Sequence, residues 1–150
     1  MKGCKPLAGA ALLVLVLAPA AFAQQPAAAG RIKVVTGSAF IVRGGATVPA
    51  RAGDEVFASD ALQTGADGSL GVTLKDDTRV SLGPSSEVRL ERYVYAPDSG
   101  ALGMVLHFVR GMGAYISGRM AKMAPDSIRL ETPAAIVGVR GTTLALNVDE

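Results

Sequence analysis

Cysteine and aromatic side chains are scarce in this chain. Its one cysteine, Cys4, lies in an N-terminal leader that we expect to be removed, and tryptophan is absent. A mature chain without cysteine has no disulfide bond and no thiolate to act as a nucleophile or metal ligand. Because aromatic residues make up only 5% of the sequence, the core must be built from Val, Leu, Ile and Met. We therefore expect the domain to be stabilised by aliphatic packing.

An excess of positive charge is also missing from the expected mature chain. The whole chain has 15 Lys and Arg residues against 13 Asp and Glu residues. Removal of Lys2 and Lys5 with the leader leaves 13 of each sign. Nucleic-acid binding needs clustered Lys and Arg side chains. The charge balance therefore argues against a nucleic-acid partner and against electrostatic attachment to membranes.

The first 23 residues have the layout of a secretory signal peptide. Lys2 and Lys5 precede an uncharged run over residues 7–22, and Ala21-Phe22-Ala23 places small residues at a cleavage site. The run is short for a membrane-spanning helix, which needs about 20 apolar residues, so an uncleaved anchor is the less favoured alternative. We predict a signal peptide at 1–23, a periplasmic or secreted product, and no stable membrane insertion after cleavage.

Apolar residues recur at every second position through most of the remaining chain. Residues 24–30 (QQPAAAG) are typical of a flexible tether, and residues 31–150 have the size of one domain. Period-two alternation buries one face of a strand and exposes the other. Clusters of Gly, Asp, Ser and Pro separate the runs, and Lys75-Asp76-Asp77-Thr78 is the clearest hairpin turn. The pattern predicts an all-β single domain of short strands, whose clearest runs are 70–74, 78–82, 88–90, 102–108, 128–130 and 137–148.

Two arrangements of these strands fit the sequence. Gly37, Gly53, Gly68 and Gly83 recur at a short and nearly constant spacing, which favours the stacked coils of a β-solenoid. Short strands between regular turns fit a sandwich or barrel equally well. We expect either a solenoid-like arrangement or a rolled β-sheet. The best helix candidate is 117–124, one or two turns long, and a loop with gap-filling methionines is the alternative.

The C-terminal part contains the string Thr132-Pro133-Ala134-Ala135-Ile136-Val137-Gly138-Val139-Arg140-Gly141-Thr142. Upstream, Gly53-Asp54 and Leu62-Gln63-Thr64-Gly65 precede the strand, turn and strand of 70–82. With these elements the chain resembles, over nearly all of 31–150, the FecR protein domain family. The resemblance implies an extracytoplasmic β-rich domain that contacts other proteins.

The founding members of that family regulate ferric-siderophore uptake. They join a cytoplasmic anti-sigma segment and a membrane helix to this domain, which meets an outer-membrane receptor in the periplasm. Here the leader starts within a few residues of Met1. We therefore expect a stand-alone exported domain, to which the anti-sigma activity does not carry over.

The candidate interaction residues lie in the C-terminal string. They are Thr132, Pro133, Gly138, Val139, Arg140, Gly141 and Thr142. The segment 138–142 could form an anion cradle of backbone N–H groups with Arg140 as the cation. Phosphate loops open a helix, whereas an alternating strand follows here, so a tight turn or bulge is the favoured interpretation.

Residues for metal or catalytic chemistry are few. His107 is the only histidine, and its parity is opposite to that of Leu106 and Phe108, which predicts a surface side chain. A single histidine forms no typical transition-metal site without help from carboxylates, so we expect no metal site. Asp54, Glu55, Asp60 and Asp67 sit at expected turns. Their spacing matches no calcium loop, so turn chemistry explains them.

No catalytic motif is present in the sequence. It has no G-x-S-x-G elbow, no H-E-x-x-H motif and no mature cysteine to pair with His107. We therefore expect no enzyme activity and no cofactor. The resulting hypothesis is an extracytoplasmic module that binds a cell-envelope protein or polymer, in signalling related to iron uptake where the family resemblance extends that far. The alternative is a structural envelope scaffold that self-assembles through its β-edges, which would make the chain a homo-oligomer.

Overall fold

The computed structural model describes residues 3, 27–139 and 143–149. Apart from Gly3, the predicted signal peptide lies outside these residues. The described part is built from strands, which confirms the all-β prediction. The elements are β1 (Gly30–Thr36), β2 (Ala39–Arg43), β3 (Ala46–Pro49), β4 (Glu55–Val56), β5 (Ala61–Thr64), β6 (Ser69–Leu74), β7 (Arg79–Leu82), β8 (Glu87–Ala96), β9 (Ala101–Ile116), α1 (Arg119–Met123), β10 (Ile128–Glu131), β11 (Ile136–Gly138) and β12 (Thr143–Val148), with 3₁₀ turns at Pro97–Ser99 and Pro125–Ser127.

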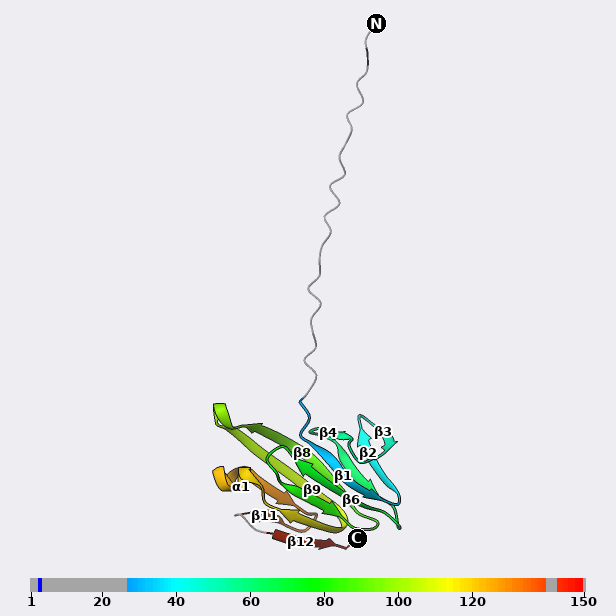
Figure 1. Cartoon of the computed structure of the whole chain (residues 1–150). Helices are drawn as coiled ribbons and strands as arrows, with labels where there is room; N and C mark the ends of the chain where they lie inside the picture. The colour runs from blue at the N-terminus through cyan, green and yellow to red at the C-terminus, as the bar shows by residue number, and fades with distance from the viewer. Residues whose placement is uncertain (1–2, 4–26, 140–142, 150) are drawn as a thin grey trace.

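The strands form one rolled sheet in the order β3-β2-β5-β8-β9-β7-β6-β1-β4. The two long strands β8 and β9 cross the middle of the domain in Figure 1. The first half of β9 pairs with β8 and β10, and its second half pairs with β7 and β12. One strand therefore belongs to both halves of the roll.

Antiparallel pairing decides between the two predicted arrangements. Every neighbouring pair along the main strand order is antiparallel, whereas the stacked coils of a solenoid pair in parallel. Among the described residues one pairing, β9 with β10, is parallel. The rolled sheet is the alternative that the structure supports, and the recurring glycines serve its turns.

The core is aliphatic and follows the predicted parity. In β6 and β7, Leu70, Val72, Leu74, Val80 and Leu82 are all at most 3% exposed. The same alternation continues through β8, β9 and β10, where it buries Val88, Leu90, Met104, Leu106, Phe108, Ile128 and Leu130. Burying an aliphatic side chain of this size contributes about 1.5–3 kcal/mol, so this one face of the roll supplies most of the stability.

The helix alternative for 117–124 is confirmed. Helix α1 covers Arg119–Met123 at one end of the domain. Met120 is fully buried in the core, whereas Met123 is about half exposed. The Met120 side chain therefore fills the core at this end of the sheet, in the gap-filling role typical of methionine.

The predicted hairpin turn at 75–78 joins β6 to β7 and contains a fully buried carboxylate. Asp77 adopts the left-handed conformation (φ 68°) that closes the turn. Asp76 is 0% exposed. Its carboxylate accepts hydrogen bonds from the Thr78 hydroxyl (2.6 Å), the Tyr93 hydroxyl (3.0 Å) and the Met120 amide (3.4 Å). One side chain thereby ties the turn to β8 and α1.

Candidate functional site

The hairpin of β10 and β11 carries the first part of the C-terminal string. Leu130 and Val137 face each other in the antiparallel register, and Thr132 and Ala135 close the turn. The Thr132 amide donates to the Ala135 carbonyl (2.8 Å), and the Ala135 amide donates back (3.4 Å) and also to the Thr132 hydroxyl (3.1 Å). Thr132 is therefore a turn residue, and Pro133 lies exposed at the tip.

The outer edge of β11 presents unpaired backbone groups. Thr132 and Ala135 exchange both hydrogen bonds, so the next pair, Glu131 and Ile136, is a non-hydrogen-bonded pair by the alternation of an antiparallel ladder. The N–H and C=O of Ile136 therefore point away from β10. No other described strand pairs with β11, so this edge can accept a further strand.

The Ile136 side chain is unusually open. It is 67% exposed, the largest value among the exposed large hydrophobic side chains of the described residues. A shallow hollow of about 590 Å³ runs beside it. The hollow is lined by Pro125, Asp126, Ile128, Arg129, Ile136, Val137, Gly138 and Val139. The edge strand, an apolar side chain and a hollow thus lie on one hairpin.

The structure describes only some of the remaining predicted residues of the string. Gly138 lies on β11 with no atom near the position of a Cβ, and Val139 is buried at 2% exposure. Arg140, Gly141 and Thr142 lie outside the described residues. The choice between an anion cradle and a tight turn at 138–142 therefore stays a prediction.

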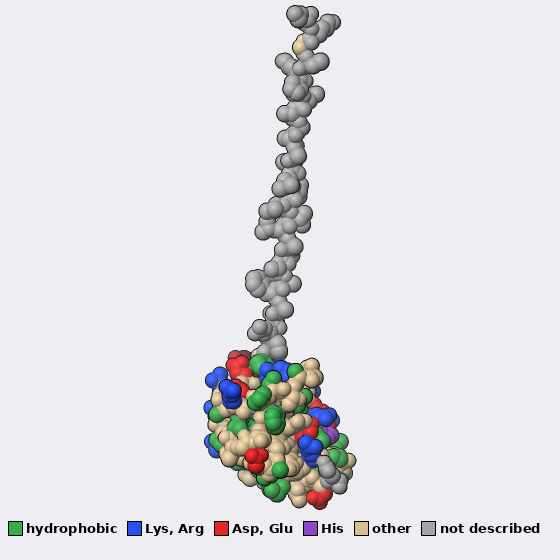
Figure 2. Space-filling view, turned by 90° about the vertical axis from the view of Figure 1, so that its right-hand side faces the viewer, with side chains coloured by type: hydrophobic (Ala, Val, Ile, Leu, Met, Phe, Trp, Pro, Cys, Tyr) green, Lys and Arg blue, Asp and Glu red, His purple; other side chains and the backbone are tan. Residues whose placement is uncertain are grey.

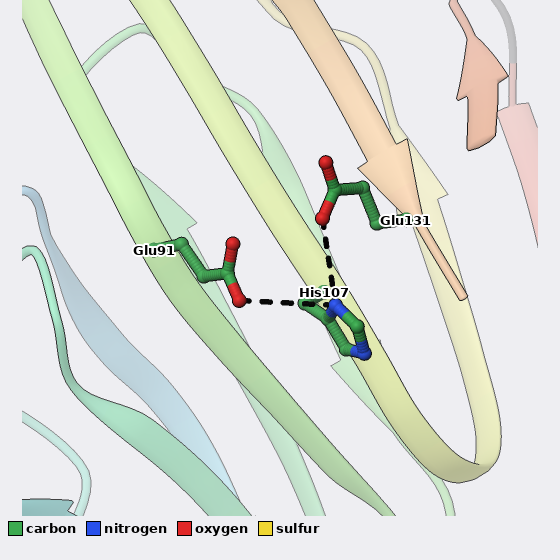
Figure 3. A group of neighbouring side chains, drawn as sticks. All are labelled: Glu91, His107 and Glu131. Carbon is green, nitrogen blue, oxygen red and sulfur yellow. Dashed lines mark ion pairs between the residues drawn. The ribbon is translucent and has the colours of Figure 1, made fainter. Parts of the chain in front are cut away.

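His107 lies on the outer face of the sheet between two carboxylates (Figure 3). Its Nδ1 is 3.8 Å from Glu91 Oε1 on β8 and 3.5 Å from Glu131 Oε2 on β10. The three side chains are 27%, 45% and 22% exposed in the order His107, Glu91, Glu131. The parity argument placed His107 correctly on the surface, but it did not find its two neighbours.

The three side chains meet because of two local features of pairing. Glu131 is the register partner of His107 in the parallel pair of β10 and β9. Between Leu90 and Arg92 the register of β8 against β9 shifts by one residue, so Glu91 is the extra residue of a β-bulge. Bulges re-aim the side chain they carry. Parity alone would have put Glu91 and Glu131 on the outer face, but register and the parallel pairing are not visible in the sequence.

The acidic residues at turns serve the structure, as predicted for Asp54 and Asp60. Asp54 accepts a hydrogen bond from the Arg51 amide (2.8 Å). Asp60 is 1% exposed and accepts from the Phe57 amide (2.9 Å) and from two nitrogens of Arg43 (2.9 and 2.7 Å). The hydrogen bond to Asp60 raises the pKa of the Arg43 guanidinium above its ordinary value. This forked ion pair joins β2 to the turn before β5.

Charges of both signs are interspersed on the surface. Figure 2 shows blue and red side chains side by side on the face in view, with small groups of hydrophobic side chains between them. In the described part of the chain, no helix is both long and apolar enough to cross a membrane.

One comparison with known proteins identifies a family that matches the chain. The family described as FecR protein matches residues 60–150, which is more than half of the sequence. Residues 31–59, which the sequence resemblance included, lie outside the match. No curated protein and no solved structure matches the chain.

Proposed function

Since the chain belongs to the FecR family, whose members are regulatory domains related to signalling, we propose that it is a non-enzymatic, extracytoplasmic binding module that captures an extended segment of a cell-envelope protein on the outer edge of β11. The family is generally non-enzymatic, and the N-terminal leader supports an extracytoplasmic location. The observation that carries the proposal is the unpaired edge at Ile136. A signalling role in iron uptake is the more specific form of the same proposal.

The β11 edge suits strand addition for a physical reason. An extended peptide can pair with the outward N–H and C=O groups of an edge strand, and its side chains gain specificity from neighbouring hollows. The outward N–H and C=O of Ile136 can form the backbone hydrogen bonds, and the hollow beside β11 can receive a side chain of the peptide. Burial of the exposed Ile136 side chain would add about 1–2 kcal/mol of hydrophobic free energy.

The edge strand β3 is a weaker candidate for the same role. It is exposed at every residue, and it lies outside the segment that matches the family. It also contains Pro49, which has no N–H to donate; natural sheets use edge prolines to discourage pairing with other chains. The β11 strand contains no proline within Ile136–Gly138.

The proposal can be tested with the substitution Ile136→Pro. The N–H that it removes points away from β10, so the β10–β11 ladder is kept, and edge strands tolerate proline at such positions. We expect thermal unfolding close to that of the wild type. We also expect an envelope protein retained by the immobilised wild-type chain to be lost from Ile136→Pro and from Ile136→Asp. Val34→Asp is the matched control, because Val34 is also an exposed apolar strand residue (58%) but lies on β1.

Three outcomes would contradict the proposal. Equal retention by the wild type and Ile136→Pro would remove the β11 edge from recognition. Retention that survives protease treatment of the envelope extract would identify a polymer as the partner. Sedimentation that depends on concentration in the wild type and not in Ile136→Pro would assign the edge to self-association, the scaffold alternative.

A further inference from the structure

Glu91, His107 and Glu131 bring three potential ligand atoms together on the outer face of the sheet. The ligand atoms all lie within 4.8 Å of one another, and they come from three adjacent strands, β8, β9 and β10 (Figure 3). We propose that these side chains form a binding site for one divalent transition-metal ion of the zinc type. The site is adjacent to the β11 edge, because Glu131 is the cross-strand neighbour of Ile136, but it uses different groups and does not depend on the function proposed above.

The distances within the cluster fit a shared ion better than direct hydrogen bonds. The Nδ1 atom of His107 is 3.5 and 3.8 Å from the two carboxylate oxygens, whereas N–H···O bonds span about 2.7–3.2 Å. Two ligands bound to a tetrahedral zinc at about 2.1 Å lie roughly 3.4 Å apart. The two distances from Nδ1 are therefore close to the spacing of ligands around one zinc centre, and all three ligand atoms lie within 4.8 Å of one another.

The charges around His107 favour a cation at the same place. Both carboxylates approach the same nitrogen, Nδ1, and the other ring nitrogen points away from them in Figure 3. One Nδ1–H can serve one carboxylate only. A divalent ion at this point would satisfy both carboxylates and the nitrogen lone pair together.

Neighbouring cations leave the ligand atoms accessible. Arg129 Nη1 is 3.9 Å from Glu131 Oε1, the oxygen other than the one that faces His107. Arg89, the register partner of His107, is 3.2 Å from Glu87 Oε1 through its Nε. The partial exposure of all three candidate ligands gives an ion access from solvent and room for water as a fourth ligand.

The mixed set of ligands selects the class of metal. Imidazole together with carboxylates suits zinc and its first-row neighbours, whereas calcium and magnesium prefer sites made only of oxygens. The sheet also fixes the ligand positions, because His107 and Glu131 are register partners and Glu91 is held in a bulge between the paired residues Leu90 and Arg92. We therefore expect zinc to bind and calcium at the same concentration not to bind.

Titration of the purified protein, prepared without a histidine tag, with Zn²⁺ in a calorimeter tests the proposal. We expect one site per chain. We expect His107→Ala to weaken binding at least tenfold, and Glu91→Gln and Glu131→Gln each to weaken it several-fold. Glu55→Gln is the matched control, because Glu55 is an exposed strand carboxylate beside Arg31 and far from the cluster in the strand order. The zinc affinity of the Glu55→Gln variant should equal that of the wild type.

Nuclear magnetic resonance provides a second measurement, the ¹⁵N signals of His107, which zinc would not change if the cluster had only a structural role. The chain has a single histidine, so its two ring nitrogens give one pair of ¹⁵N signals. Zinc should shift the Nδ1 signal strongly, in proportion to occupancy, and calcium should leave it unchanged. Thermal unfolding in the presence of a chelator should be the same for the wild type and the variants, because all three side chains lie on the outer face.

Several results would overturn the metal site. These are no saturable zinc binding, binding that persists unchanged in His107→Ala, or a zinc-induced shift at the other ring nitrogen alone. If His107→Ala unfolded, the double variant with Glu91→Gln and Glu131→Gln would decide the matter with the imidazole intact. The Ile136→Pro variant should still bind zinc, so failure of this proposal and failure of the β11-edge proposal can be told apart.

Discussion

Two hydrogen bonds join Asp76 in the β6–β7 turn to Tyr93 on β8. The Tyr93 hydroxyl donates to Asp76 Oδ1 (3.0 Å) and accepts from the Asp76 amide (3.1 Å). Burial, followed by the nearby charge of Asp76, raises the pKa of the Tyr93 phenol far above its ordinary value of 10.0. The phenol therefore stays neutral in the folded protein at pH values where an exposed tyrosine ionises.

This contact predicts a loss of stability in alkali. The folded-state pKa of Tyr93 is raised, so its contribution is complete below about pH 10 and is lost as the pH rises further, while the unfolded chain ionises. We expect the free energy of unfolding to fall by about 1 kcal/mol between pH 10 and 11 from this group, less than the limit of about 1.4 because the unfolded tyrosine is only partly ionised near pH 10.

Denaturant unfolding of the wild type and Tyr93→Phe between pH 8 and 11 checks this prediction. The variant should be less stable at pH 8 by about 1–2 kcal/mol, since its hydrogen bonds are lost. The free energy of unfolding of the variant should also decline less steeply above pH 10 than that of the wild type. Burial raises the pKa of Tyr115 as well, so part of the decline should remain. Parallel curves for the two proteins would contradict the assignment.

At the scale of elements, β9 turns from one half of the roll to the other near Gly111. This residue has φ +80°, and a Cβ on it would meet the Ser85 carbonyl oxygen and the Ser86 Cα, both at 2.7 Å. The Ser86 hydroxyl also accepts a hydrogen bond from the Met112 amide (2.9 Å). The bend therefore requires both a left-handed backbone and the close approach of another segment, and glycine allows both.

Gly111→Ala should consequently be strongly destabilising. The positive φ costs about 1–2 kcal/mol for alanine and the clash with backbone atoms adds about 1–3 kcal/mol, so we expect a loss of about 3 kcal/mol in denaturant unfolding. Gly44→Ala is the control, because Gly44 also has positive φ (+57°) but no atom lies near its Cβ position. It should lose only about 1 kcal/mol. Equal losses for the two variants would show that the close approach is not a constraint.

Alternation in the sequence marked the strands from β6 onward, but it did not single out β1 to β5 and could not assign the partners of any strand. Leu70, Val72 and Leu74 mark β6 because a period of two is a local property. The glycine spacing left the solenoid and the rolled sheet equally open, since both use short strands and turns. The pairing of Glu131 with His107 depends on a parallel crossover through α1, and the position of Glu91 depends on one extra residue in β8. Both are long-range features, so the cluster could not be predicted from spacing.

At the scale of the whole molecule, the family match is smaller than the folded unit. The match begins at residue 60, but β1, β2 and β4 contribute Ile32, Ile41 and Val56 to the same core, all at most 3% exposed. β1 also pairs with β6 along most of its length. Even Ala29, in the segment predicted as a tether, is buried, and its amide donates to the Val56 carbonyl (2.7 Å).

A fragment of residues 60–150 should therefore fail to fold. It would lose the core side chains of β1, β2 and β4 and leave the edge of β6 that pairs with β1 without a partner. Removal of even a few buried aliphatic side chains at about 2–5 kcal/mol each exceeds the stability of most domains. We expect no cooperative thermal unfolding and poor dispersion of amide signals, whereas a fragment of residues 27–150 should behave like the full chain. A sharp transition in the shorter fragment would contradict this expectation.

The sharing of β9 between the two halves has a consequence for how the domain can open. Its first half hydrogen-bonds to β8 and β10, and its second half to β7 and β12. Each half of β9 therefore has hydrogen-bonded neighbours on both sides over much of its length, which protects its amide protons from solvent. Deuterium should enter this strand more slowly than the edge strands β3 and β11, which can open without disturbing it.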